Sequence, residues 1–174
     1  MNSDIKLKIR GTLEQLGASG DLAEQRSLPL FAEATELEIA HISANGREHL
    51  LLPEAAVAWR GMRHSAAEEG ITLLIISGFR AFDRQVELIR AKLKRGESID
   101  DILSVMAPPG CSEHHSGCAV DIGTPGCEPL SETFENTEAF GWLEQRAHEY
   151  GYWLSYPRGN AEGFAYEPWH WCYR

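Results

Sequence analysis

Histidine and carboxylate side chains that could bind a metal ion and hydrolyse a bond gather in two short segments near the end of the chain. The first is Ser112–Asp121 (SEHHSGCAVD) and the second is Glu167–His170 (EPWH). Together they offer two imidazoles and a carboxylate, a donor set that suits Zn²⁺, with a separate glutamate. A catalytic zinc ion leaves one coordination position for water, and a carboxylate that is not a ligand takes the proton of that water. Glu167 fits the role of that base.

The spacing within the second segment restricts its backbone. Residues three apart in a regular strand face opposite sides, so Glu167 and His170 share a site only where the chain bends. Pro168 lies between them and favours such an irregular stretch.

The first segment combines a turn with a strand. Gly117 allows a tight turn after His114, and the strand-like residues 119–121 could then direct Asp121 back towards that histidine. A single histidine near apolar residues is more often a hydrogen-bonded structural residue than a ligand. Spacing alone therefore leaves both interpretations open.

The surrounding elements indicate an α+β fold, with helices packed against a small, mainly antiparallel sheet and the zinc site in a cleft. Helical spacing of apolar residues and terminal Pro or Gly predict helices over residues 4–17, 53–69, 81–95, 98–106 and 137–150. Strands or extended segments are predicted over residues 36–43, 48–52, 71–77, 118–122, 152–155 and 164–173. The first two strands are expected to form a hairpin around a two-residue Asn45-Gly46 turn.

A third motif, Ser77–Arg80 (SGFR) with Gln85 downstream, stands at the end of a predicted buried strand. The pattern Ser-x-His-x-x-Gly-x-Ala-x-Asp fills residues 112–121, and Glu-x-x-His follows at 167–170. In this order, the three motifs resemble the D-alanyl-D-alanine carboxypeptidase family of zinc peptidases, which includes the VanY, VanX and VanXY types and LD-carboxypeptidases. The resemblance extends over residues 47–173.

The resemblance implies a role for each matching residue. The implied ligands of one zinc ion per chain are His114, Asp121 and His170. Glu167 would be the general base that later protonates the leaving amine. Arg80 would polarise the scissile carbonyl and stabilise the oxyanion. Ser112 and Gln85 would hold the terminal carboxylate or the backbone of the substrate.

The implied activity is removal of the C-terminal D-alanine from peptidoglycan stem peptides or precursors, as in a D-Ala-D-Ala carboxypeptidase. An LD-carboxypeptidase or an L-alanyl-D-glutamate endopeptidase would share the zinc site and differ in the walls of the cleft. A third alternative is a zinc-stabilised module that binds cell-wall peptides without catalysis. Glu167 and Arg80 argue against that module, because binding alone needs neither a base nor an oxyanion partner.

Other residues near the motifs receive structural interpretations. His115 is interpreted as a substrate-side or surface residue, because its side chain would point away from the metal in an extended chain. Trp169 and Trp171 are interpreted as packing residues, and Cys118 as a small core residue. Glu113 could tune the site without being a ligand. The four cysteines form no CxxC pair and are expected to be reduced thiols, with a disulfide as the alternative for an exported protein.

Length and charge exclude several classes of protein. The 174 residues suit a single domain, with residues 1–46 as an N-terminal helix and hairpin arm and residues 47–174 as the zinc peptidase core. The net charge of −10 and the lack of a basic cluster longer than Lys92–Arg95 argue against nucleic-acid binding. No stretch reaches the ~18 apolar residues of a membrane span. The first residues, MNSDIK, do not resemble a secretory signal, so we expect a cytoplasmic monomer, or a periplasmic or secreted protein if a signal was removed.

Overall fold

Short helices and strands follow one another in this computed structural model, which describes residues 3–174. The α-helices are α1 (Ser3–Gln15), α2 (Leu22–Gln25), α3 (Pro53–Glu68), α4 (Phe82–Lys94), α5 (Ile99–Val105) and α6 (Glu138–Arg146). The strands are β1 (Glu38–Ile42), β2 (Glu48–Leu51), β3 (Leu74–Ser77), β4 (Ala119–Gly123), β5 (Tyr152–Leu154) and β6 (His170–Tyr173). The 3₁₀ helices are η1 (Glu113–Ser116), η2 (Glu132–Asn136) and η3 (Ala147–Tyr150). The predicted α+β fold is confirmed.

The larger sheet has four antiparallel strands in the order β3-β4-β6-β5. β4 lies in its interior, and every residue of this strand is buried. Asp121 of β4 lies opposite His170 at the start of β6 and opposite Ser77 at the end of β3. The register of the sheet therefore brings all three sequence motifs to one place.

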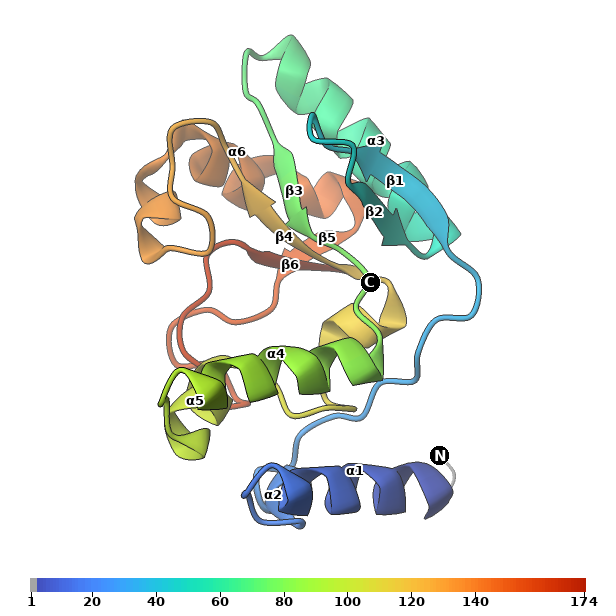
Figure 1. The fold of residues 1–174 in the computed structure, drawn as a ribbon. Coiled ribbons are helices and arrows are strands. Elements are labelled where there is room, and N and C mark those ends of the chain that lie inside the picture. The colour runs from blue at the N-terminus through green and yellow to red at the C-terminus, as the bar shows by residue number, and fades with distance from the viewer. Residues whose placement is uncertain (1–2) are drawn as a thin grey trace.

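The main core lies between this sheet and helices α3 and α6 (Figure 1). Trp59 and Met62 of α3 and Leu143 of α6 are fully buried there. Burying a large apolar side chain stabilises the fold by about 1.5–3 kcal/mol. Pro53 begins α3, and Gly70, with a positive φ of 80°, follows its end, as the sequence predicts.

The first two helices cover the side of α4 and α5 that faces away from the sheets (Figure 1). Ile9 and Leu13 of α1 share a second apolar cluster with Val86 and Ile89 of α4 and Ile102 of α5. The N-terminal helices thus bury the apolar face of α4, whose opposite face is directed towards the sheet.

Residues 31–34, which we call the strap, connect this helical arm to the motif around His115. The Glu33 carboxylate accepts a hydrogen bond from the Phe82 N–H at the start of α4. A carboxylate in this position satisfies a free helix N–H and interacts favourably with the helix dipole. Two backbone hydrogen bonds also hold the strap. Phe31 N–H donates to the Gly110 carbonyl at 2.9 Å, and Ala34 N–H donates to the His115 carbonyl at 2.8 Å. The strap therefore holds the start of α4 against the η1 segment.

The β1–β2 hairpin differs from the prediction in its turn. Ser43 N–H donates to the Arg47 carbonyl, so the loop has three residues, Ala44–Gly46, where two were predicted. Gly46 has a positive φ of 82° and closes the turn by donating to the Ser43 carbonyl. The extra residue is accommodated because glycine adopts this conformation without a steric penalty.

Two other predicted elements extend too far. The strand predicted over residues 71–77 begins at Leu74, because Leu74 lies opposite Gly123, the last residue of its partner β4. The helix predicted over residues 137–150 gives way to η3 at Ala147. Both differences lie at element ends, away from the motifs.

None of the helices within residues 3–174 has the length and apolar character that crossing a membrane requires. The cysteines carry free thiols, as predicted, at positions Cys111, Cys118, Cys127 and Cys172. Cys118 is half-buried, so its interpretation as a core residue is wrong. Cys111 and Cys172 are buried, and burial raises the pKa of both thiols.

Candidate active site

A cleft of about 530 Å³ separates α4 and α5 from the segment that joins β5 to β6. The predicted site residues that line it are Arg80, Gln85, Ser112, His114, Asp121, Glu167 and His170. The structure therefore brings every residue of the sequence prediction into one cavity. Ala165 N–H donates to the Ser104 carbonyl at 3.2 Å and ties the two walls together.

His114, Asp121 and His170 form a buried triad at one end of this cleft. The Asp121 oxygens lie 3.3 Å from Nε2 of His114 and 3.1 Å from Nδ1 of His170. One ligand atom from each residue lies within 4.8 Å of the others. The two imidazole rings stand nearly perpendicular, at 88°, with centroids 4.9 Å apart. Two nitrogens and one oxygen thus converge on a common point.

The orientation of His114 is fixed by the backbone. Its Nδ1 lies 2.8 Å from the Gly78 carbonyl, which can only accept, so Nδ1 carries the proton and the Nε2 lone pair faces Asp121. A Cβ at position 78 would lie 2.7 Å from the Leu50 carbonyl oxygen. Glycine is therefore required where β2 passes the end of β3, beside the group that orients His114.

His170 presents Nδ1 to Asp121 and Nε2 to Glu113, whose carboxylate lies 2.9 Å away. Burial by itself lowers the pKa of His170, but hydrogen bonds to Asp121 and Glu113 outweigh it and raise the pKa to about 10. A proton on Nδ1 therefore occupies the place between His170 and Asp121. A metal ion that replaced this proton would meet the Nδ1 lone pair, the Asp121 carboxylate and Nε2 of His114. These donors fit a zinc ion.

Glu113 is the site residue to which the sequence motifs assign no definite role. It is buried and accepts hydrogen bonds from His170 and from Ser155 Oγ, the latter at 2.5 Å. The Arg174 guanidinium lies 3.4 Å from its second oxygen. Burial raises the pKa of Glu113, but the His170 hydrogen bond and charge outweigh burial and lower the pKa to about 2. The ionised carboxylate holds His170 with Nδ1 towards the triad, as outer carboxylates commonly do for metal-binding histidines.

Arg80 extends from the loop after β3 into the cleft beside the triad. Its Nη1 donates to Gln85 Oε1 and its Nη2 to Ser77 Oγ, both at 3.0 Å. Nη2 also lies 3.5 Å from the Asp121 carboxylate. Burial lowers the pKa of Arg80, whereas Asp121 and Glu167 raise it, and a guanidinium stays charged in such surroundings. The structure thus places a fixed positive charge at the triad.

Gln85 and Ser112 both line the cleft, and both are buried. Gln85 is 1% exposed, accepts from Arg80 and donates through Nε2 to the Ala107 carbonyl at 2.7 Å. In this structure it braces Arg80. Ser112 lines the cleft directly before η1. The substrate-binding roles of both residues stay predictions.

Glu167 lies in the irregular stretch before β6, as the expected bend requires. Its backbone N–H donates to the Tyr156 carbonyl, and its carbonyl accepts from His170 N–H, both at 3.1 Å. This turn places the carboxylate 3.8 Å from Nδ1 of His170. Burial raises the pKa of Glu167 to about 7, against the opposing effect of His170. A carboxyl group with a pKa near neutrality can both take and return a proton.

The interpretation of His115 as a substrate-side or surface residue is wrong. η1 is a helical turn and not an extended chain, so His115 points away from the triad into the protein and is fully buried. Its Nδ1 donates to the Arg80 carbonyl at 2.6 Å, and Nε2 accepts from Gly110 N–H at 3.0 Å. Trp171 is a packing residue, as predicted, whereas Trp169 packs on the core and also lines the cleft.

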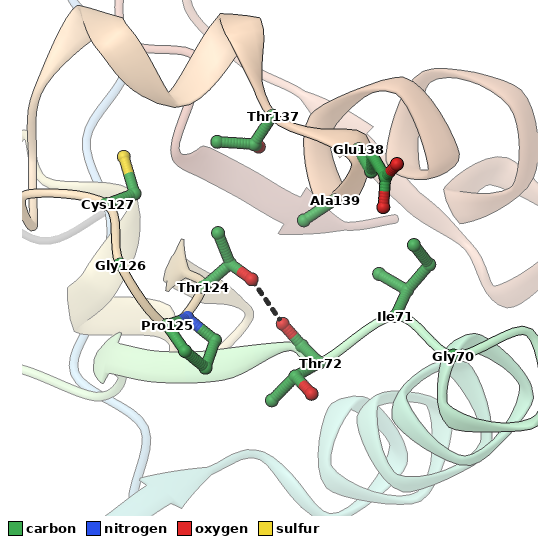
Figure 2. A pocket seen from close by; sticks show the side chains of 10 residues that line it. All are labelled: Gly70, Ile71, Thr72, Thr124, Pro125, Gly126, Cys127, Thr137, Glu138 and Ala139. Atoms are coloured by element: carbon green, nitrogen blue, oxygen red, sulfur yellow. Dashed lines mark hydrogen bonds between the residues drawn. The ribbon is translucent and has the colours of Figure 1, made fainter.

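A second pocket, of about 370 Å³, lies between the segment that precedes β3, the turn after β4 and the start of α6 (Figure 2). Thr124 Oγ1 donates to the Thr72 carbonyl at 2.8 Å on its floor, and Cys127 stands at its edge (Figure 2). None of the predicted catalytic residues lines this pocket. The chemistry indicated by the sequence therefore belongs to the cleft at the triad.

Comparison with known proteins agrees with this geometry. The profile of one family, described as VanY: D-alanyl-D-alanine carboxypeptidase, matches residues 48–174. This chain belongs to the VanY family. The putative carboxypeptidase YodJ of Bacillus subtilis (strain 168) is 32% identical over 160 residues, covering 84% of this chain and 56% of that protein. VanXYC of Enterococcus gallinarum, a bifunctional D-Ala-D-Ala dipeptidase and D-Ala-D-Ala carboxypeptidase, is 34% identical over 129 residues, covering 71% of this chain and 66% of that protein. The chain spans less than two thirds of the length of these relatives.

Solved structures of VanY-type and LD-type enzymes share the fold. The LdcB LD-carboxypeptidase superposes with a TM-score of 0.72 and 31% identity, covering 83% of this chain and 71% of that one. VanYB in complex with D-alanine-D-alanine gives a TM-score of 0.64 and 27% identity, covering 80% of this chain and 77% of that one. A VanY D,D-pentapeptidase variant in complex with Zn(II) gives a TM-score of 0.64 and 25% identity, covering 85% of this chain and 88% of that one. The His114–Asp121–His170 triad is consistent with a metal site in this zinc-binding family.

Proposed function

We propose that this chain is a zinc-dependent carboxypeptidase that removes the C-terminal D-alanine from peptidoglycan stem peptides or their precursors, with one zinc ion per chain. The observation that carries the proposal is the triad of His114, Asp121 and His170 with Glu167 and Arg80 beside it, in a chain of the VanY family. The Zn(II) complex of a VanY relative supports the choice of metal. The complex of VanYB with D-alanine-D-alanine supports the choice of substrate.

The side chains of this chain divide the work of hydrolysis. When bound, zinc would supply a Lewis acid that polarises a carbonyl and lowers the pKa of a water molecule. Glu167 lies close enough to the triad to take a proton from an attacking water and return it to the leaving amine. Arg80 holds a positive charge near the position where the carbonyl oxygen becomes an oxyanion. The surrounding burial strengthens both interactions, because charges interact more strongly away from bulk water.

A second candidate is cleavage of an L,D bond, as in an LD-carboxypeptidase. The similarity to LdcB favours it, since the TM-score of 0.72 exceeds the 0.64 found for VanYB. Both activities use the same catalytic residues and differ in the stereochemistry at the residue that donates the scissile carbonyl. The shape of the cleft wall beyond the triad would make that choice.

The deciding experiment offers the zinc-loaded protein a pentapeptide stem ending in D-Ala-D-Ala and a tetrapeptide stem ending in a single D-Ala. Mass spectrometry of the products is expected to show loss of one alanine from the pentapeptide. Release of alanine from the tetrapeptide alone would favour the L,D activity. A chelator should abolish turnover and added zinc should restore it. Zinc binding without release of an amino acid from either peptide would contradict both candidates and favour a binding module.

A further inference from the structure

The cleft continues well past the triad along one face of α4. Gln85, Leu88, Lys92 and Arg95 all line it and recur at intervals of three or four residues, so they share that face of the helix. Measured from Gln85 along the helix axis, Lys92 lies ~10 Å and Arg95 ~15 Å farther on. An extended peptide advances ~3.3 Å per residue. This part of the cleft is therefore long enough for about three or four residues of a peptide.

The walls of this extension are largely apolar, and they end at charged groups. The apolar lining residues are Leu88, Ala91, Val105, Leu130 and Phe164. The Ala165–Ser104 hydrogen bond fixes one wall of the cleft against the other. A peptide lying here would pack its backbone and side chains between apolar walls and bring its far end to the basic side chains of α4.

Lys92 and Arg95 share one carboxylate, that of Glu97. Lys92 Nζ lies 2.9 Å from one oxygen, and Arg95 Nη2 lies 3.0 Å from the other. Glu97 also accepts from Arg95 Nε at 3.3 Å, which leaves the Nη1 side of the guanidinium and two of the three ammonium protons for other acceptors. Two positive charges on one negative charge leave a net positive charge at this end of the cleft.

The positive charge is confined to the α4 wall, because the opposite wall carries an acidic group. Glu132 also lines the cleft, and it shares the Arg158 guanidinium, 3.4 Å away, with Glu135, which lies 2.9 Å from the same group. The chain as a whole carries a net charge of −10, which opposes the approach of an acidic ligand. An excess of positive charge on the α4 wall of a peptide-sized cleft is therefore a feature that a negatively charged substrate group would use.

We propose that Lys92 and Arg95 form an anion subsite that binds a carboxylate of the peptide substrate, about three or four residues from the scissile bond. The inference rests on the proposed function, because the scissile bond is placed at the triad. It adds a substrate preference, for peptides with an acidic group at that distance. Glu97 acts as a positioning residue that holds the two cations side by side.

The test uses N-acetylated peptides that end in D-Ala-D-Ala and carry a single glutamate at successive positions from the scissile bond. Each peptide has a matched partner with glutamine in the same place. Steady-state kinetics give kcat and KM for the zinc-loaded protein, and calorimetry gives the dissociation constant of the same peptides. We expect a KM about fivefold lower for glutamate than for glutamine at the third or fourth position, with kcat unchanged.

The variants Lys92→Gln and Arg95→Gln should each reduce this preference, and the double variant should abolish it. Lys94→Gln is the matched control, since Lys94 lies on the same helix, is exposed and does not line the cleft. Circular dichroism checks that each variant remains folded. Equal binding and equal KM for the glutamate and glutamine peptides would overturn the subsite, as would a preference that survives in the double variant.

The binding measurement separates this inference from the proposed function. If no peptide is cleaved but the glutamate peptides bind more tightly in a Lys92-dependent manner, the subsite stands and the carboxypeptidase proposal fails. If all peptides are cleaved alike and bound alike, the carboxypeptidase proposal stands and the subsite fails.

Discussion

At the triad end of the cleft the functional side chains are buried and hydrogen-bonded to other protein groups. At the far end, Lys92 and Arg95 lie on the surface of a helix and have hydrogen-bond donors that Glu97 does not use. His114, Asp121 and His170 are each 3% exposed. The side chains of Lys92 and Arg95 are 28% and 62% exposed. Catalytic groups must be held to a fraction of an ångström, which requires such internal partners. Charges that bind a flexible peptide need no such precision and cost little when they remain partly hydrated.

The two ends also differ in the elements that carry them. Two members of the triad, Asp121 and His170, lie on adjacent antiparallel strands whose register fixes the distance between them, and His114 comes from η1. The far end is carried by α4 and its C-cap Arg95, where the helix period and the shared carboxylate of Glu97 set the spacing of Lys92 and Arg95. Changes at the triad end should therefore alter metal binding and kcat, and changes at the far end should alter KM.

The largest effect is expected for Glu167→Gln. Without a group that takes and returns the proton, kcat should fall by about 10²- to 10⁴-fold. The zinc content, measured by atomic absorption, should be unchanged, because Glu167 is not a member of the triad. A variant that retains most of the wild-type kcat would show that another group is the base.

A smaller effect is expected for Glu113→Gln, which removes the charge that orients His170. Zinc affinity, measured by competition with a chromogenic chelator, should fall by about 10- to 100-fold, as for other outer carboxylates. Glu48→Gln changes the same residue type at an exposed position of β2 and serves as the control. Equal zinc affinities for wild type and Glu113→Gln would contradict the orienting role.

The metal-free protein should show a pH-dependent difference in stability between wild type and Glu113→Gln. The pKa of Glu113 is lowered from 4.5 to about 2, so its pairing stabilises the fold above pH 4.5 and is lost as pH falls towards 2. The pKa of His170 is raised from 6.5 to about 10, so its pairing stabilises the fold below pH 6.5 and is lost as pH rises towards 10. The difference in Tm between wild type and the variant should therefore be largest between pH 4.5 and pH 6.5, where both pairings are complete.

Thermal unfolding with a chelator present, repeated across this pH range, measures the difference. The two Tm curves should converge at both extremes. A constant difference at every pH would mean that Glu113 acts by packing and not by charge.

The smallest effect is expected at the far end of the cleft. Raising the salt concentration from about 0.05 to 0.5 M should raise KM for a glutamate peptide by about two- to fivefold, because these cations are exposed to screening. The value of kcat and the KM of the matched glutamine peptide should change little. If salt altered kcat and left both KM values unchanged, the assignment of kcat to the triad end and of KM to the far end would be wrong.

The sequence identified the residues that gather at the triad end because they lie in short motifs with specific spacing, and their roles stay predictions. It predicted the helices from apolar periodicity and the bend at Pro168 from strand geometry. It gave no definite role to Glu113, because the contacts that define this residue, to His170 and Ser155, join distant segments of the chain. The misinterpretation of His115 has the same origin, since its burial depends on pairing with Arg80 and Gly110.

The cations at the far end were not predicted from the sequence, for another reason. Lys92 and Arg95 have the pattern of an ordinary solvated helix face, and only the position of the opposite wall shows that this face borders a cleft. The turn of the β1–β2 hairpin was mispredicted because Asn-Gly is compatible with turns of either length, and Arg47 decides between them by pairing with Ser43.

The strap has a consequence for how the molecule assembles. Glu33 and Ala34 are synthesised long before Phe82 and His115, the residues to which they bond. The apolar face of α1 must therefore wait for α4 and α5 to leave the ribosome before it finds its partners. Until then this face is free to associate wrongly, as unpaired apolar surfaces of nascent chains do. Completion of the catalytic centre is thus expected to follow synthesis of nearly the whole chain, with docking of the earliest segment among its last steps.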